Sequence, residues 1–364
     1  MLRASLSILC SFLAATAAVR SARACVPVPR ERKFEIVGLG GALAGRRFAV
    51  APESLGKARC LEDVIAVGPG GAMLAVPGAG GWTMFAAGKE QPLEGAVAPV
   101  RFSPDGKQIA FVRANKLAVL DLASGAIRLE DVSDAVRLAW TASGLVALRH
   151  SRGADELFVL SSPPRRIGSW PGELQAFSAA GTKALVVSGD AARVIDLERG
   201  STGKMRRGVR EGVLNPEGTQ ALLATRTSIL LDDLSGRSRV LAQGQKPGGL
   251  CWTHEPAWVA DSRAAAWVGD RVVSGPDLWP ASIQCLGDRD QIAISGSREL
   301  VLWSPSTGSR EVLPVRHSCL VSVPGTAMAL GGPLSVQVLM DRKPLPVCDD
   351  EKLPQNLGTL DNGR

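Results

Sequence analysis

The feature that most constrains the fold of this chain is an internal repeat of about 37 residues. One series of turn positions, each just before an apolar segment, is Gly71, Gly106, Gly144, Gly181, Gly218, Ser262 and Gly325. A second series, in step with the first, is Gly88, Gly125, Pro163, Gly200, Gly236, Gly275 and Gly308. Two landmarks that share one period indicate a repeated structural unit.

The clearest unit is 100–130, VRFSPDGKQIAFVRANKLAVLDLASGAIRLE. It has room for three or four short strands separated by polar turns and none for a helix. A single four-stranded sheet cannot bury both of its faces, so such units stack and close into a ring. We therefore predict an all-β fold, a β-propeller of four-stranded antiparallel blades. The count is eight blades, with seven as the alternative because the Gly275–Gly308 interval is short and 245–256 reads as an irregular insertion.

The repeat also suggests domain boundaries. Residues 1–24 are predicted as a signal peptide, 63–348 as the propeller and 349–364 as a polar tail. The remaining segment, 25–62, contains FAVAPESLGKARCLE at 48–62, which aligns with LAVLDLASGAIRLE at 117–130. This half-unit could complete the last blade by pairing the two ends of the chain.

Two turns of the clearest unit carry a family resemblance. Phe102 to Gly106 and Leu117 to Gly125 resemble the repeats of the TolB-like and WD-like propellers, with their F-S-P-D-G-K and D-x-x-S/T-G turns. The resemblance identifies a repeat type and not an orthologue. TolB itself has an α/β domain ahead of its propeller, and no helix-period segment of adequate length precedes residue 63 here. Its partner-binding role therefore does not carry over.

The N-terminus predicts export. Arg3, an apolar stretch from Ala4 to Val19 and an A-x-A sequence ending at Ala24 follow the order of a secretory signal, so we expect cleavage between Ala24 and Cys25. Lipidation of Cys25 is the alternative. The uncharged run 64–88 contains seven glycines and two prolines, which argues against a membrane helix. The predicted location is periplasmic or extracellular, with no transmembrane segment after cleavage.

Cysteine usage agrees with export. Removal of the signal leaves six cysteines without any C-x-x-C spacing, so disulfides are favoured over a zinc or thioredoxin-type site. Cys251 with Cys285 is the preferred pair because both lie in one repeat-sized segment. Buried free thiols are the alternative.

A search for chemistry finds no catalytic, cofactor or metal site. The chain has no tyrosine, which excludes mechanisms that need one, and no serine has the G-x-S-x-G setting of a nucleophile elbow. The three histidines, His150, His254 and His317, fall in different repeats. Convergence on a metal in a central channel is conceivable, but scattered turn or strand-end residues are the favoured interpretation.

Tryptophan is the residue whose distribution bears on binding. Trp252, His254 and Trp258 crowd the irregular segment beside Cys251 and form a candidate binding loop. Packing between blades is the favoured alternative for the aromatic residues.

Composition limits the partners. Net charge is +7 for the whole chain and +4 without the three signal arginines, and aromatic residues are only 4%, so nucleic acid is not expected. We predict a monomeric, exported, non-catalytic scaffold in the cell envelope that binds a protein or a small ligand. The alternatives are a propeller enzyme of lyase, lactonase or quinoprotein type, with its site in the central channel, and a lipid-anchored structural protein of the envelope.

Overall fold

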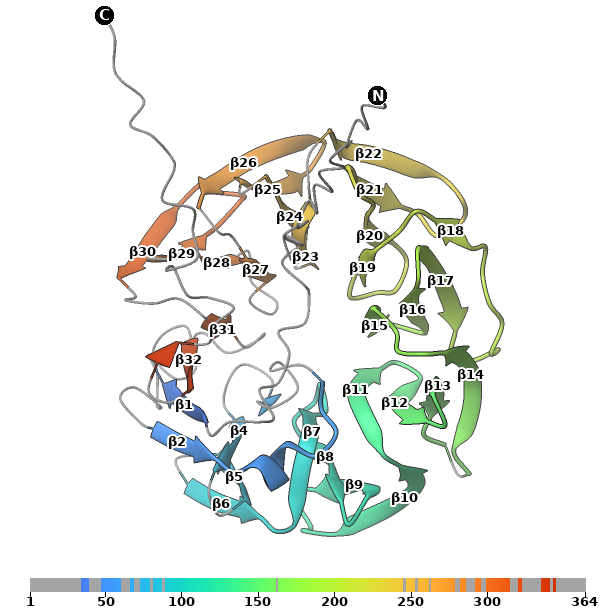
Figure 1. Ribbon diagram of the computed structural model, residues 1–364, viewed down its shortest axis with the longest axis vertical. Coiled ribbons are helices and arrows are strands. Elements are labelled where there is room, and N and C mark those ends of the chain that lie inside the picture. The colour runs from blue at the N-terminus through green and yellow to red at the C-terminus, as the bar shows by residue number, and fades with distance from the viewer. Residues whose placement is uncertain are drawn as a thin grey trace, which may run out of the picture.

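A computed structural model describes the residues 34–38, 47–59, 66–68, 73–78, 81–86, 89–161, 163–244, 247–252, 255–261, 263–278, 282–285, 292–295, 299–314, 320–322, 335–340 and 343–344. Their strands form eight antiparallel sheets arranged in a ring (Figure 1). The prediction of an all-β propeller is confirmed. No helix in this described part of the chain is long and apolar enough to cross a membrane.

Seven sheets each contain four strands that follow one another along the chain, with the first strand innermost and the fourth outermost (Figure 1). We number these sheets 1 to 7 in chain order. Sheets 1 and 2 comprise β3 (Ala66–Val67), β4 (Met73–Gly78), β5 (Gly81–Ala86) and β6 (Lys89–Leu93), then β7 (Ala96–Phe102), β8 (Gln108–Arg113), β9 (Lys116–Asp121) and β10 (Ile127–Ser133). Sheets 3 and 4 comprise β11 (Ala135–Thr141), β12 (Gly144–Ser151), β13 (Ala154–Val159) and β14 (Arg165–Pro171), then β15 (Ala176–Ala180), β16 (Lys183–Ser188), β17 (Ala191–Asp196) and β18 (Arg206–Arg207).

The remaining sheets continue the ring. Sheets 5 and 6 comprise β19 (Glu211–Leu214), β20 (Ala221–Ala224), β21 (Ser228–Asp232) and β22 (Ser238–Gln243), then β23 (Pro247–Trp252), β24 (Pro256–Ala260), β25 (Arg263–Val268) and β26 (Arg271–Asp277). Sheet 7 comprises β27 (Ser282–Cys285), β28 (Ile292–Ser295), β29 (Glu299–Trp303) and β30 (Arg310–Pro314). The closing sheet runs, from inside to outside, through β31 (Leu320–Ser322), β32 (Ser335–Met340), β1 (Phe34–Gly38) and β2 (Arg47–Val50), and β33 (Lys343–Pro344) also pairs with β32.

The closing sheet joins the two ends of the chain. β1 pairs antiparallel with β32, with Phe34 opposite Met340 and Gly38 opposite Val336, and β2 pairs with β1. The sheet that completes the ring therefore takes strands from both ends of the sequence. Closure of this kind protects the open faces that an unclosed stack of sheets would leave.

The repeated turns are held by their own polar side chains. The Ser103 hydroxyl donates to Asp105 at 2.6 Å, and Asp105 accepts the N–H of Lys107. In sheet 5 the side chain of Asn215 accepts the N–H groups of Thr219 and Gln220. Asp and Asn favour such turns because they can satisfy nearby backbone donors.

One predicted turn position in sheet 6 was wrong. Gly275 lies inside β26, and a Cβ on it would come within 2.7 Å of the Trp303 ring in sheet 7, so this glycine is needed for close packing. The predicted turn at Ser262 lies outside the described residues, between the second and third strands of the sheet, β24 and β25. The error arose because 245–256 was interpreted as an insertion, whereas its residues 247–252 form the innermost strand β23.

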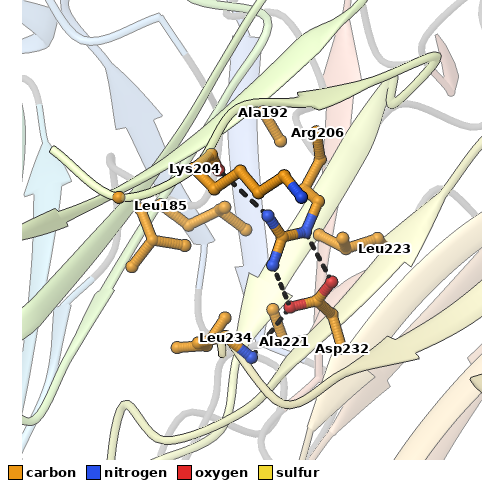
Figure 2. Close-up of a pocket in the computed structure, with 10 residues that line it drawn as sticks. Leu185, Ala192, Lys204, Arg206, Ala221, Leu223, Asp232 and Leu234 are labelled. Carbon is orange, nitrogen blue, oxygen red and sulfur yellow. Dashed lines mark hydrogen bonds and ion pairs between the residues drawn. The ribbon is translucent and has the colours of Figure 1, made fainter. Parts of the chain in front are cut away.

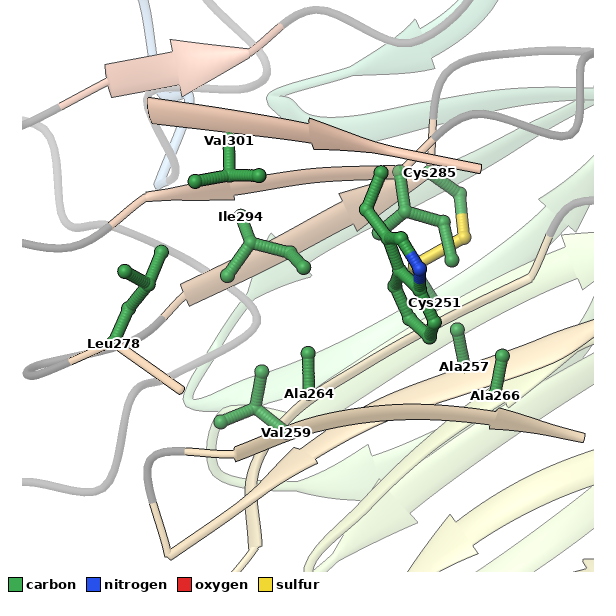
Figure 3. Packing of buried hydrophobic residues seen from close by; sticks show 11 residues of the cluster. Cys251, Ala257, Val259, Ala264, Ala266, Leu278, Cys285, Ile294 and Val301 are labelled. Carbon is green, nitrogen blue, oxygen red and sulfur yellow. A yellow bond between two sulfur atoms is a disulfide. The ribbon is translucent and has the colours of Figure 1, made fainter. Parts of the chain in front are cut away.

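A covalent bond joins two neighbouring sheets. Cys251 in β23 and Cys285 in β27 are linked by a disulfide with their Cα atoms 5.5 Å apart. Figure 3 shows the disulfide at one end of a buried apolar layer that includes Val259, Ile294 and Val301. The bond therefore ties together the inner strands of sheets 6 and 7.

Residues 51–59 follow β2, the outermost strand of the closing sheet, and precede sheet 1. We call this segment the strap. The 3-10 helix η2 (Pro52–Leu55) lies in the strap, over β5 and β7 (Figure 1). The Trp82 indole N–H donates to the carbonyl of Ser54 at 2.9 Å, and Leu55 and Ala58 are buried. The strap is therefore packed onto sheets 1 and 2.

Candidate functional site

The strand order defines two faces of the ring. Because strands alternate in direction, each connection between sheets lies on the same face as the turn between the second and third strands. We call this the Asp155 face, after the residue at its most polar point. The opposite face carries the first-to-second and third-to-fourth connections.

A buried carboxylate organises the Asp155 face. Asp155 is the second residue of β13, and its side chain is fully buried. Both of its oxygens accept hydrogen bonds from Arg59 in the strap, at 2.7 and 2.8 Å. The Leu174 N–H donates to Oδ2 at 2.7 Å, and His150 Nδ1 lies 2.8 Å from Oδ1. We call Arg59, His150, Asp155 and Glu173 the polar node.

The electrostatics of the node follow from these contacts. Burial alone would raise the pKa of Asp155, but the Arg59 guanidinium, the Leu174 N–H and His150 outweigh it, so the pKa lies below its ordinary value. An ionised carboxylate only accepts hydrogen bonds. His150 Nδ1 therefore carries the proton in this contact, and Nε2 is the ring nitrogen left for a ligand or solvent.

The node presents polar groups at the surface. The His150 side chain is 33% exposed, and that of Glu173 is 66% exposed. Glu173 Oε1 also lies 3.7 Å from Arg59 Nη2. The strap, the β12–β13 hairpin and the loop after β14 meet here, so segments nearly 100 residues apart in sequence are held in one arrangement.

Neighbouring turns on this face are also tightly defined. The β8–β9 connection has two residues with positive φ, Ala114 and Asn115, and the β12–β13 connection has Arg152 and Gly153. Two positive φ values are typical of type I′ hairpin turns, whose twist matches that of the strands. Short turns of this kind hold the surface around the node in a fixed shape.

The residues predicted from the sequence as functional do not form one site among the described residues. Cys251 and Cys285 are bonded to each other, whereas Ala24, Cys25, His254 and His317 lie outside the described residues. Trp252 ends β23, and Trp258 is in the middle of the neighbouring strand β24 with 1% of its surface exposed. Trp258 packs with Leu222 and Leu250 between sheets 5 and 6. The predicted binding loop is therefore largely a pair of strands, and Trp258 is part of the core.

Sequence reasoning missed Arg59, Asp155 and Glu173. His150 was considered only as a metal ligand or a strand-end residue. A signal was available for Asp155, since alternation along ADELFV places a carboxylate on the buried side of its strand. Its partner Arg59, 96 residues away, had no such signal because only the ring brings them together.

One cavity lies between sheets 4 and 5. It has a volume of about 20 Å³, and Figure 2 shows Arg206 and Asp232 at its wall, with Arg206 Nε 2.7 Å from Asp232 Oδ2. A volume of this size holds about one water molecule and no larger ligand. No group of three or more His, Cys, Asp or Glu side chains suited to a metal ion occurs among the described residues.

Comparisons with known proteins identify the fold. No protein-family model matches the sequence, and no curated protein matches it. A solved structure described as a eukaryotic initiation factor is similar over 86% of this chain and 95% of its own, with 12% identity and a TM-score of 0.51. At this identity the likeness shows the fold alone.

Two further solved structures have lower TM-scores. Hsv2 of Kluyveromyces lactis covers 69% of this chain and 97% of its own, with 12% identity and a TM-score of 0.49. The β-propeller domain of Cps50 (Swd1) from Myceliophteria thermophila covers 65% and 94%, with 14% identity and a TM-score of 0.44. The TolB-like type of the repeat stays a prediction from the turns of residues 100–130.

Proposed function

We propose that this chain is an exported, non-catalytic β-propeller that serves as a binding scaffold in the cell envelope and engages a protein through the Asp155 face. The observation that carries the proposal is the polar node. Its buried carboxylate fixes three separate segments, and it holds the partly exposed His150 ring and the Glu173 carboxylate in place. Binding surfaces gain affinity when their polar groups are ordered before the partner arrives.

Two features support export. The N-terminal sequence up to Ala24 has the order of a secretory signal. The Cys251–Cys285 disulfide suits an oxidising compartment. Mass analysis of the N-terminal peptide tests this part of the proposal, with an unmodified chain that begins at Cys25 as the expected result. A retained Met1 would contradict export, and a lipid on Cys25 would favour the membrane-anchored alternative.

Binding is tested by photo-crosslinking in cells that make the protein. A photoreactive residue is placed at Gln175 or Asp190, both exposed on the Asp155 face, and for comparison at Ser124 or Ser235, both exposed on the opposite face. We expect a discrete protein adduct from the first pair only. No adduct at any position, or equal adducts from both faces, would contradict the proposal.

A second arm tests the node itself. His150→Ala with Glu173→Ala removes the two exposed groups of the node and keeps Asp155 and Arg59 in contact. The expected result is at least a roughly tenfold loss of the adduct, because binding energy is concentrated in a few residues near the centre of an interface, each of which costs more than about 1 kcal/mol when truncated. Ser124→Ala on the opposite face is the matched control. Retention of the adduct in the double variant would exclude the node as the contact.

A further inference from the structure

The positive charge of the protein is concentrated on one part of the ring. Residues 163–210 contain nine Lys or Arg and four Asp or Glu, an excess of +5. The chain without residues 1–24 carries +4. All of its positive surplus therefore lies within the outer strand of sheet 3 and sheet 4.

Four exposed cations lie along the outer edge of sheet 4: Arg193, Arg199, Lys204 and Arg207. We call them the basic rim. Arg207 is opposite Ala191 in the β17–β18 pair, so Arg193, two residues along β17, projects from the same side of the hairpin. Diagonal neighbours of this kind stand about 7–8 Å apart. Figure 1 shows β17 and β18 at the outside of the ring.

Two of the carboxylates near the rim are engaged in other ion pairs. Asp196 is bonded to Lys183 at 2.6 Å, and this contact with nearby backbone N–H groups lowers its pKa to about 2. Asp232 holds Arg206, which faces sheet 5 (Figure 2). Asp190, which directly precedes β17, and Glu198 are the exposed carboxylates that remain in 190–207. No ion pair involves Arg199, Lys204 or Arg207 within the described part of the chain.

The two sides of the outer hairpin therefore differ. The side that faces sheet 5 carries Lys204 and Arg206 at the cavity wall, and Arg206 is paired with the buried Asp232 carboxylate. The other side carries Arg193 and Arg207, which are exposed and have no carboxylate partner among the described residues. Like charges held together destabilise a folded protein unless something else balances them. An anionic partner would supply that balance.

We propose that the basic rim is the surface by which this protein docks onto an anionic lipid bilayer, with the ring edge-on to the membrane. β18 is the outermost strand of sheet 4 and lies at the periphery of the ring, where its exposed cations can meet a flat surface (Figure 1). The cations of the rim are long, exposed side chains, and the cavity that Lys204 helps to line has a volume of only about 20 Å³, which suits the diffuse charge of lipid headgroups better than a small bound ligand. This role does not depend on the Asp155 face.

The test is co-sedimentation of the purified protein with vesicles. Phosphatidylcholine vesicles that contain phosphatidylglycerol are compared with pure phosphatidylcholine vesicles, which report any contribution from the apolar segment 4–19. We expect binding only to the anionic vesicles, with loss of binding as salt is raised because screening shortens the range of the attraction. Absence of binding to the anionic vesicles at low salt would overturn the proposal.

Variants locate the surface. Arg193→Glu with Arg207→Glu should weaken anionic-vesicle binding by roughly tenfold or more, whereas Arg193→Lys with Arg207→Lys should keep it. The matched control is Arg226→Glu with Arg271→Glu, which makes the same change in net charge at exposed sites on other sheets. Equal weakening by both Glu pairs would overturn the proposal.

Rim-dependent binding to soluble heparin without binding to vesicles would also overturn the proposal, in favour of a soluble polyanion. Unchanged thermal melting verifies that each variant is folded.

Discussion

At the scale of single residues, the most unusual group is the carboxyl of Glu211 at the start of β19. The residue is partly exposed as a whole, but its Oε1 atom is buried and has no hydrogen-bond partner. Burial raises the pKa of Glu211 to about 7, although the Leu250 N–H in sheet 6 donates to the carboxylate and opposes the rise. The neutral acid is therefore the form that suits the folded protein near and below neutrality.

This raised pKa predicts a dependence of stability on pH. Below pH 4.5 the carboxyl is neutral in both the folded and the unfolded chain and has no effect. Between pH 4.5 and about 7 it ionises only in the unfolded chain, so the free energy of unfolding falls as pH rises. Above pH 7 the free energy of unfolding is lower by on the order of 3 kcal/mol than it is below pH 4.5, because each unit of pKa difference corresponds to about 1.36 kcal/mol.

Glu211→Gln should remove this dependence. We expect the variant to match the parent near pH 4 and to be more stable near pH 8, because an amide can still accept the Leu250 N–H and never ionises. Urea unfolding at the two pH values measures the difference. An identical change with pH in the parent and the variant would show that Glu211 ionises freely in the folded state.

At the scale of elements, the strap depends on one close approach. Gly56 has φ of +48°, and a Cβ there would lie 2.2 Å from the carbonyl oxygen of Ala98 in β7. Any larger residue must lift the strap from sheet 2. Three contacts between the strap and the sheets would then be disturbed. They are Ser54 with Trp82, Lys57 with Asp134, and Arg59 with Asp155.

Gly125 provides a control for this effect. It also has a positive φ, +72°, but a Cβ there meets nothing within 4 Å. Gly125→Ala should cost about 1 kcal/mol for the backbone conformation alone. Gly56→Ala should cost at least about 2 kcal/mol more, with faster proteolysis of the strap. Equal melting temperatures for the two variants would contradict the packing of the strap on β7.

The innermost strand of sheet 6 shows why one element was misread. β23 begins with Pro247, Gly248 and Gly249, which are typical of loops, and its apolar residues come only in the second half, at 250–252. A strand of this composition is stabilised by its neighbours, since β23 contacts β19 and β27 and carries half of a disulfide. Local sequence preference therefore gave a loop where tertiary contacts form a strand.

At the scale of the whole molecule, stability depends on closure. Removal of residues 34–50 deletes β1 and β2 and leaves the closing sheet without its two outer strands. We expect the melting temperature to fall by roughly 10 °C or more, with self-association through the exposed strand edge. A synthetic 34–50 peptide should restore the parent melting temperature.

Removal of the predicted tail 349–364 is the control for closure, and it should leave melting unchanged. If removal of 34–50 had no larger effect than removal of the tail, the pairing of β1 with β32 would not be what closes the ring.

The sequence by itself determined the all-β class, the repeat and most of its turns, because these depend on alternation of apolar residues and on Asp, Asn and Gly at fixed spacing. The unit 100–130 has the strands and turns expected from its residues. It also suggested Cys251 and Cys285 as partners.

Only the tertiary structure decided which distant residues meet. Arg59 with Asp155, Gly275 with Trp303 and Glu211 with Leu250 are pairs that cross from one part of the ring to another. The strand or turn preference of the residues around each partner is the same whether or not the other partner is present. The physical reason is that these contacts arise from how sheets stack around a closed ring, and the local preferences of a chain do not encode which side chains come into contact across neighbouring sheets.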